Sequence, residues 1–301
     1  MRRTLTLQQQ MRESMDEEFA QRIRVHQNRI SRLKNARAAL IRTGAALASA
    51  PLAMLAHGDS WFDYPLDGNG LSFADTDVIA QLRTMGNLNP IILNISHYGD
   101  SSTDEMSWPK QQRLIEALQN PDNWMETGKP DAILFSGGGD DVAGDQFCIF
   151  LNNFTPGGAG LNNVRFPKAL DLVEASYLDL FDFRDQHASD VPVFGHCYDF
   201  PIPNGAHPDC IGPWLKPSLD FSGWHNLTDA TLIVQQALQQ FRARLLTLAG
   251  DPNNKFTMVD TQGTLDPAQD WANELHPFPD GFQKIAGRFV EVLRARFPGR
   301  I

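Results

Sequence analysis

Four positions in the sequence carry groups that could do chemistry together. Ser60, Gly99 and Asp140 each come shortly after a short apolar run, and His276 comes just before the last helical pattern of the chain. In an open α/β sheet, ligands bind beyond the carboxyl ends of the strands, so residues that follow such runs converge on one edge. We therefore expect a hydroxyl, a backbone N–H without a neighbouring Cβ, a carboxyl group and an imidazole to meet there.

This set of groups suits acyl transfer. A serine hydroxyl is a poor nucleophile at its free pKa and needs a base within hydrogen-bond reach. Histidine fits that role because its ordinary pKa lies near neutrality. The oxyanion of the tetrahedral intermediate needs preorganised donors, and the N–H groups of Ser60 and Gly99 could supply them. This chemistry calls for no cofactor and no metal.

The segments around these positions resemble the sequence blocks of the SGNH/GDSL hydrolases. The four matching segments are Gly58-Asp59-Ser60-Trp61, Tyr98-Gly99-Asp100-Ser101, Gly138-Gly139-Asp140-Asp141 and Asn273-Glu274-Leu275-His276-Pro277. The resemblance runs from residue 51 to the last residue, about five-sixths of the chain, and keeps the order of the blocks. It implies a serine esterase that forms an acyl-enzyme on Ser60, with His276 as the general base and with Ser60, Gly99 and Asp140 around the oxyanion.

Two positions depart from the blocks of that family. Where the family has an asparagine that donates to the oxyanion, this chain has Asp140, and an ionised carboxylate can only accept. Either the surroundings keep Asp140 protonated, or the backbone donors serve alone. Where the family has the aspartate of the triad, this chain has Asn273, whose amide oxygen can accept from His276 and hold its tautomer. Asp270, Glu274 or no residue at all are the alternatives for that supporting role.

Other polar residues near the blocks have structural interpretations. Ser101 completes a second Gly-Asp-Ser tripeptide, but it stands where a helix begins, so we expect it to cap that helix. We expect His57 to pack at a strand end, Asp59 to form structural hydrogen bonds and Asp141 to stabilise its turn. Ser60 is therefore the predicted nucleophile.

The residue types raise two further kinds of site, a metal site and a phosphate-binding loop. A metal-dependent phosphoesterase would use the acidic residues and the histidine of the blocks, namely Asp59, Asp140, Asp141 and His276. The other histidines that we considered show no paired ligand spacing with the cysteines; they are His187, His196, His207 and His225. The run Gly137-Gly138-Gly139 lacks the Lys-Ser/Thr ending of a phosphate-binding loop.

The elements that must position these residues follow from the alternation of apolar runs with helical patterns. Short apolar runs predict buried strands at 52–57, 91–96, 132–136, 191–195 and 256–259. Apolar residues at helical spacing predict helices at 77–85, 103–118, 168–187, 227–248 and 282–297. Strands that alternate with helices of this length are typical of a parallel sheet. We predict a three-layer α/β/α fold with a doubly wound, flavodoxin-like sheet of about five strands.

The chain is expected to divide into a helical N-terminal arm at 1–50 and a hydrolase-like domain at 51–301. Residues 5–48 read as helix, because six large apolar residues recur there at spacings of three, four and seven: Met11, Met15, Phe19, Ile23, Ile30 and Leu33. Three roles are open for this arm: packing on its own domain, contacts between the copies of a homo-oligomer, or contact with a membrane surface.

The segment 142–225 is less regular than the rest of the domain. It holds many Gly and Pro residues, and among them stand the aromatic residues Phe147, Phe150, Phe154, Trp214, Phe221 and Trp224. Long irregular chain in a compact domain is often functional. The segment fits a lid or an acyl pocket, and its aromatics equally fit the core.

Charge and composition limit the class of function. The net charge of −10 argues against a dedicated nucleic-acid binder. Residues 1–50 hold ten Lys/Arg and four Asp/Glu, so a basic arm could dock on the acidic body, on a partner or on an anionic surface. No early apolar run follows Arg2 and Arg3, and the stretch 43–56 is too short to cross a bilayer, so we expect a cytoplasmic protein.

The three cysteines, Cys148, Cys197 and Cys210, are expected to be reduced thiols, with a Cys197–Cys210 disulfide as the alternative in an oxidising compartment. The expected substrate is a small-molecule ester or an ester of a lipid or a sugar. The alternative is a catalytically impaired binding or scaffold protein that keeps the hydrolase fold, which the departures at Asp140 and Asn273 and the basic arm suggest.

Overall fold

The computed structural model describes residues 6–44, 49–65, 76–125, 127–207, 210 and 212–301. At its centre lies a five-stranded sheet in the order β2-β1-β3-β4-β5, in which every neighbouring pair is parallel. The strands are β1 Ala53–Gly58, β2 Ile91–Asn94, β3 Ala132–Ser136, β4 Val193–His196 and β5 Phe256–Val259. This order is the flavodoxin-like one, so the predicted sheet is confirmed.

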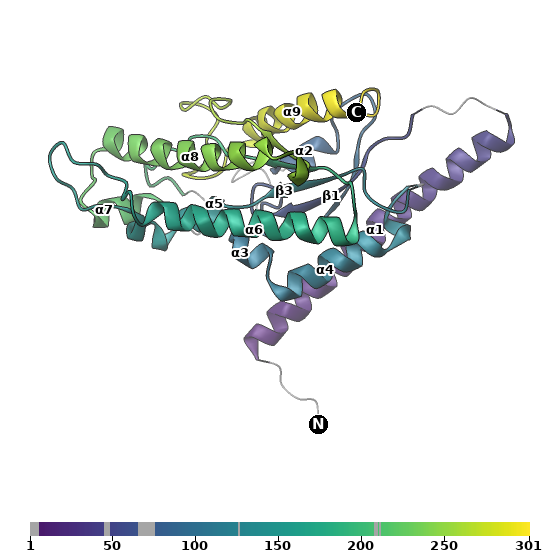
Figure 1. Ribbon diagram of the computed structural model, residues 1–301, viewed down its shortest axis with the longest axis horizontal. Coiled ribbons are helices and arrows are strands. Elements are labelled where there is room, and N and C mark those ends of the chain that lie inside the picture. Colours follow the sequence, from purple (N-terminus) through teal and green to yellow (C-terminus); the bar gives the residue numbers. More distant parts are fainter. Residues whose placement is uncertain (1–5, 45–48, 66–75, 126, 208–209, 211) are drawn as a thin grey trace.

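Helices cover both faces of the sheet. They are α1 Leu7–Arg42, α2 Val78–Leu82, α3 Ser102–Glu105, α4 Trp108–Gln119, α5 Gly139–Val142, α6 Phe166–His187, α7 Lys216–Phe221, α8 Leu227–Gly250 and α9 Pro279–Arg296. Short 3₁₀ helices are η2 Pro121–Asn123, η3 Asp145–Phe150 and η4 Pro252–Asn254. Helices α2 and α9 pack together on one face, while α3, α4, α6 and α8 lie on the other (Figure 1). The predicted three layers are therefore present.

Several predicted boundaries are wrong in detail. The helix predicted at 103–118 is two helices, α3 and α4, because the chain turns at Ser107 before Pro109, and proline cannot continue a helix from the preceding turn. The first strand begins and ends one residue later than predicted, and the second ends at Asn94 rather than Ser96. These shifts do not move the site residues away from the strand ends.

The register of β1 and β3 positions two of the predicted site segments. Gly58 at the end of β1 lies opposite Ser136 at the end of β3. The turn that carries Ser60 and the turn that carries Asp140 therefore leave the sheet side by side. Strand β4 continues the same edge, since Phe135 lies opposite Gly195.

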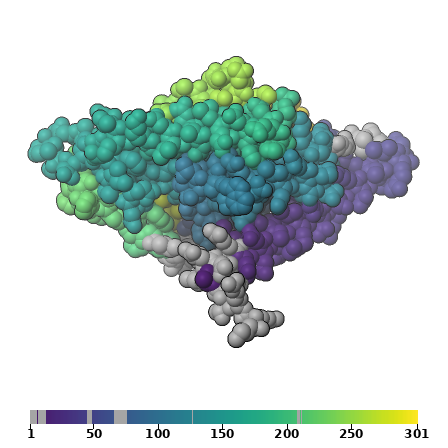
Figure 2. Space-filling view, turned by 60° about the horizontal axis from the view of Figure 1, so that its bottom comes forward, coloured from purple at the N-terminus to yellow at the C-terminus, as the bar shows by residue number. Residues whose placement is uncertain are grey.

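Helix α1 packs on its own domain. It ends at Arg42, earlier than predicted, and residues 45–48 of the predicted helix lie outside the described residues. Phe19 and Ile30 are buried against the domain, and Arg22 donates to Asp63 over 2.8 Å and to the Ser96 carbonyl over 3.2 Å. The basic arm thus docks on the acidic body, while the C-terminal end of α1 extends past the other elements (Figures 1 and 2). Among the described residues, no helix has the length and apolar character needed to cross a bilayer.

Candidate active site

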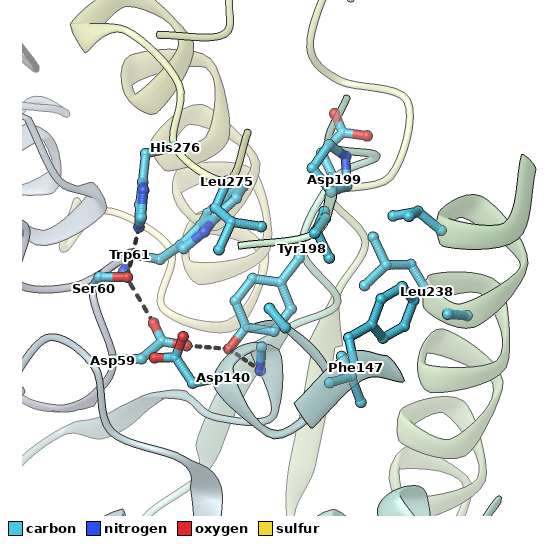
Figure 3. Close-up of a pocket in the computed structure, with 17 residues that line it drawn as sticks. Asp59, Ser60, Trp61, Asp140, Phe147, Tyr198, Asp199, Leu238, Leu275 and His276 are labelled. Atoms are coloured by element: carbon cyan, nitrogen blue, oxygen red, sulfur yellow. Dashed lines mark hydrogen bonds between the residues drawn. The ribbon is translucent and has the colours of Figure 1, made fainter. Parts of the chain in front are cut away.

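The side chains of Ser60 and His276 meet at the carboxyl edge of the sheet (Figure 3). Gly58 ends β1 with φ +153°, and a Cβ on it would lie 2.5 Å from the Ser136 carbonyl oxygen, so only glycine fits this close approach of strands. Ser60 stands in the turn that follows. Its hydroxyl lies 2.7 Å from His276 Nε2. The predicted nucleophile and base are therefore within hydrogen-bond distance.

Asn273 holds the loop of His276 and its imidazole. The Asn273 amide oxygen accepts the N–H groups of Leu275 and His276 over 2.9 and 2.8 Å, and it lies 3.2 Å from His276 Nδ1. Tyr64 and Trp214 pack on the imidazole, with ring centroids 4.4 and 5.5 Å away. Burial lowers the pKa of His276 to about 3. The imidazole is therefore neutral at ordinary pH, with Nδ1–H toward Asn273 and the Nε2 lone pair toward the Ser60 hydroxyl.

The two carboxyl alternatives to Asn273 are engaged elsewhere. The Glu274 carboxylate accepts four backbone N–H groups, from residues 205, 214, 215 and 216, over 2.6–3.0 Å. Asp270 pairs with Lys284 over 2.6 Å, and although burial opposes it, the hydrogen bonds from Lys284 and Asp266 hold the pKa of Asp270 below its usual value. Asn273 is the group in contact with His276 Nδ1.

Ser60 and Gly99, the two predicted backbone donors, both line a cleft at the site. Gly99 has φ +77°, a conformation that favours glycine. Gly99 and Ser60 line the same cleft of about 490 Å³, together with Tyr64, Tyr98, Trp214 and His276. Within the described part of the chain, neither the Ser60 N–H nor the Gly99 N–H donates to another residue.

Asp140, the third residue predicted around the oxyanion, lines the same cleft. Its Oδ2 atom is buried and makes no hydrogen bond within the described residues. Burial, followed by the nearby carboxylates of Asp59 and Asp141, raises the pKa of Asp140 well above its usual value. The protonated carboxyl group has an O–H to donate. The chain therefore favours the first of the two alternatives for Asp140, a neutral acid.

Several solved structures are similar to this chain. An extracellular lipase from Streptomyces rimosus is 15% identical with a TM-score of 0.49, and the match covers 82% of this chain and 99% of the lipase. A member of the lipolytic G-D-S-L family from Veillonella parvula is 16% identical with a TM-score of 0.44, and the match covers 79% of this chain and 96% of that protein. A family 3 carbohydrate esterase from Clostridium thermocellum is also 16% identical with a TM-score of 0.44, and the match covers 82% of this chain and 98% of the esterase.

The likeness is one of fold. No protein-family model and no curated protein matches the sequence. The reaction and the substrate therefore have to be argued from the residues of this chain.

The rival serine and the neighbouring polar residues have structural contacts. Ser101 is the N-cap of α3 and forms a capping box with Asp104, so its predicted role is confirmed. Asp141 accepts the N–H and the hydroxyl of Ser102 over 2.7 and 2.9 Å. His57 is buried in β1, and its Nε2 donates to the Glu105 carbonyl over 2.9 Å. None of these hydrogen bonds involves the Ser60 hydroxyl.

Sequence reasoning missed a buried network beneath Ser60. The Ser136 hydroxyl donates to Asp59 over 2.7 Å and accepts from His196 Nε2 over 2.8 Å. The Tyr198 hydroxyl also donates to Asp59 (Figure 3). Burial raises the pKa of Asp59 to about 6, although these hydrogen bonds oppose the shift. Tyr198 is the second residue after the end of β4, so the strand-end rule that selected Ser60 could have found it.

A second cavity, the apolar pocket, opens beside Ser60. Its lining is largely hydrocarbon from α5, η3, α8 and the loops around them, including Val142, Phe147, Leu215, Val234, Ala237 and Leu238. Of the six aromatics predicted for the pocket or the core, Phe147 lines this pocket and Trp214 lines the cleft. Phe154 packs on Trp224 with ring centroids 5.0 Å apart, Phe150 packs on Phe166, and Phe221 is exposed. The aromatics of 142–225 therefore divide between the site and other parts of the domain.

The alternatives based on metal and disulfide chemistry find no matching arrangement. Among the described residues, no three His, Cys, Asp or Glu side chains are grouped so as to hold a metal ion. Asp59 and Asp141 are committed to the hydrogen bonds given above. No disulfide joins Cys197 to Cys210, and Cys197 is buried.

Proposed function

We propose that this protein is a serine esterase that hydrolyses a carboxylic ester through an acyl-enzyme on Ser60. The observation that carries the proposal is the 2.7 Å separation of the Ser60 hydroxyl from His276 Nε2. His276 takes the hydroxyl proton as Ser60 attacks the ester carbonyl, and then gives that proton to the leaving alcohol. Water, activated by the same imidazole, releases the acid and restores Ser60.

Three donors are proposed to hold the oxyanion: the N–H groups of Ser60 and Gly99 and the O–H of protonated Asp140. The neutral carboxyl takes the place of an asparagine amide, because both present a hydrogen to the negative oxygen. A carboxyl group kept neutral by its surroundings so that it can donate is a known device of active sites.

The two cavities that Ser60 lines suggest how the ester is oriented. The apolar pocket would take the acyl group, because its lining offers hydrocarbon surface and few polar groups, and its volume of about 50 Å³ admits only a short one. The cleft with Tyr64, Tyr98 and Trp214 would take the alcohol, since its volume of about 490 Å³ is larger and it carries aromatic faces and polar groups. The proposed substrate is therefore an ester of a short apolar acid. The same geometry suits a small-molecule, lipid or sugar alcohol.

The test is the loss of activity in Ser60→Ala, measured with p-nitrophenyl esters at fixed protein concentration. We expect kcat/KM to fall by at least about 10³-fold in a folded protein, because the nucleophile is gone. Ser101→Ala is the matched control, since it removes the serine of the other Gly-Asp-Ser tripeptide and should leave the rate within about threefold.

A fluorophosphonate probe separates the proposal from its alternative. An esterase is labelled at Ser60 and the label is absent from Ser60→Ala. An impaired binding or scaffold protein of the same fold would give no label and no turnover in the wild type. Labelling at Ser101 instead would overturn the assignment of the nucleophile.

A further inference from the structure

The Tyr198 side chain bridges the two turns that carry Ser60 and Asp140. Its hydroxyl donates to Asp59, the residue before Ser60, and accepts the N–H of Gly139, the residue before Asp140, over 3.0 Å (Figure 3). A phenol can do both at once because its oxygen is a donor and an acceptor. We infer that Tyr198 is a positioning residue that sets the distance between the nucleophile and the Asp140 oxyanion donor. The inference rests on the proposed function.

The backbone at Tyr198 is strained in order to aim this hydroxyl. Tyr198 has φ +55°, in the left-handed region that is unfavourable for a non-glycine residue. The surrounding chain enforces it: the Tyr198 carbonyl accepts from Thr261 over 2.9 Å, and the next residue, Asp199, accepts the N–H groups of Gly263 and Leu265 over 2.7 Å each. A strained residue that other contacts hold in place is typical of a functional site.

A second route joins Tyr198 to the same carboxyl group. The Tyr198 N–H donates to His196 Nδ1 over 3.3 Å, and His196 Nε2 donates to the Ser136 hydroxyl, which donates to Asp59. Burial lowers the pKa of His196 to about 3, which keeps the neutral tautomer that this direction requires. Asp59 thus accepts three hydrogen bonds: from the Tyr198 hydroxyl, from the Ser136 hydroxyl, and from the Trp61 N–H over 2.9 Å. Its carboxyl group is a fixed acceptor beneath the nucleophile.

The Tyr198 ring itself is locked by packing. It lies edge-on to Trp61 with ring centroids 5.3 Å apart and contacts Phe241 of α8 at 5.6 Å. Only 4% of its surface is exposed, which leaves no room for another rotamer to reach solvent. Loss of the hydroxyl would leave the Gly139 N–H without its acceptor. The turn that carries Asp140 would then no longer be tied to Asp59 and the turn after β1.

The test compares Tyr198→Phe with Tyr177→Phe. Tyr177 is also buried, and its hydroxyl donates to the carbonyl of the nearby Gly137 over 3.1 Å. This control therefore removes a buried phenolic hydroxyl from the same region and leaves the contacts of Tyr198 with Asp59 and Gly139 intact. We expect Tyr198→Phe to lower kcat about 10- to 100-fold with little change in KM, because small misplacements of catalytic groups cost about that much. Tyr177→Phe should keep kcat within about threefold of the wild type.

A double-mutant cycle with Asp140→Ala separates positioning from a purely structural role. If Tyr198 acts by placing Asp140, the double variant loses little beyond Asp140→Ala alone, since the group to be positioned is gone. Losses that multiply, or a kcat for Tyr198→Phe equal to that of the wild type, would overturn the inference while Ser60→Ala remains inactive. Activity in Ser60→Ala would instead overturn the proposed function.

Hydrogen exchange of the wild type gives a measurement that does not need the variant to fold. The Gly139 amide should exchange slowly, because Tyr198 holds it. Exchange as fast as in an exposed turn contradicts the bridge.

Discussion

At the scale of single residues, Asp140 shows how one substitution in a catalytic block changes the chemistry available. An asparagine amide donates at every pH, whereas a carboxyl group donates only while it is protonated. Burial and the neighbouring carboxylates of Asp59 and Asp141 favour the protonated form of Asp140. The proposed oxyanion site therefore depends on pH in a way that an asparagine would not.

This dependence predicts the pH profile of Asp140→Asn. In the wild type, kcat/KM should fall as the pH rises through the raised pKa of Asp140, because the ionised group loses its donor and repels the oxyanion. Asp140→Asn should lack this alkaline decline. Both proteins should stay active well below pH 6.5, since burial keeps His276 neutral there.

The control is Asp140→Ala, which has no donor at any pH and should lose about 10²–10³-fold in kcat. Stopped assays from acid to alkaline pH with a non-ionising ester would measure all three proteins. Parallel alkaline limbs in the wild type and Asp140→Asn would show that Asp140 is not the group that titrates.

At the scale of elements, a single glutamate fastens the loop that supports His276. Four backbone N–H groups, from Gly205, Trp214, Leu215 and Lys216, donate to the Glu274 carboxylate. Trp214 in this loop lies edge-on to His276. Glu274 is two residues before His276 in sequence. The same short segment therefore carries the proposed base and binds the backbone around Trp214, which packs on that base.

Removal of that anchor should destabilise the protein and the site together. We expect Glu274→Ala to lower the free energy of unfolding by about 3 kcal/mol or more, because buried N–H groups lose their acceptor. Urea unfolding would measure it, with kcat/KM recorded at low denaturant. Glu291→Ala on α9 is the control, since Glu291 is exposed and forms a surface pair with Arg288, which is worth at most about 1 kcal/mol. Equal effects of the two variants would refute an anchoring role for Glu274.

At the scale of the whole molecule, acidic groups are concentrated beneath the candidate site. Glu105 of α3 is fully buried and neither carboxyl oxygen makes a hydrogen bond within the described part of the chain. Burial, followed by the carboxylates of Asp59, Asp141 and Asp140, raises the pKa of Glu105 well above 4.5. The folded state thus binds this proton more tightly than the unfolded chain does.

This excess binding predicts how stability changes with pH. The contribution of Glu105 is fully present below its unfolded pKa and is lost as the pH rises toward the folded one, by about 1.4 kcal/mol per unit of difference. Glu105→Gln carries no charge, so its thermal midpoint should match the wild type near pH 4 and exceed it increasingly toward pH 8. Glu116→Gln on the exposed side of α4 should run parallel to the wild type throughout. A constant offset for Glu105→Gln would point to packing instead of ionisation.

The sequence alone was enough for the order of the elements and for which residues stand at strand ends. Buried parallel strands need continuous apolar runs, and the runs before Ser60, Gly99 and Asp140 are visible in any reading of the chain. The helix break at Ser107 was not predicted, and α1 ends at Arg42, earlier than predicted, because helix boundaries depend on caps and on packing as much as on periodicity.

Only the tertiary structure decided which polar groups touch. Asn273, Asp270 and Glu274 are nearly equivalent in sequence, yet one faces His276, one pairs with Lys284 and one binds a loop from sixty residues away. The protonation of Asp140 and the bridge through Tyr198 likewise depend on burial and on contacts between distant strands. Electrostatics and hydrogen bonding act through space, so residue types along a chain limit the chemistry but do not assign it.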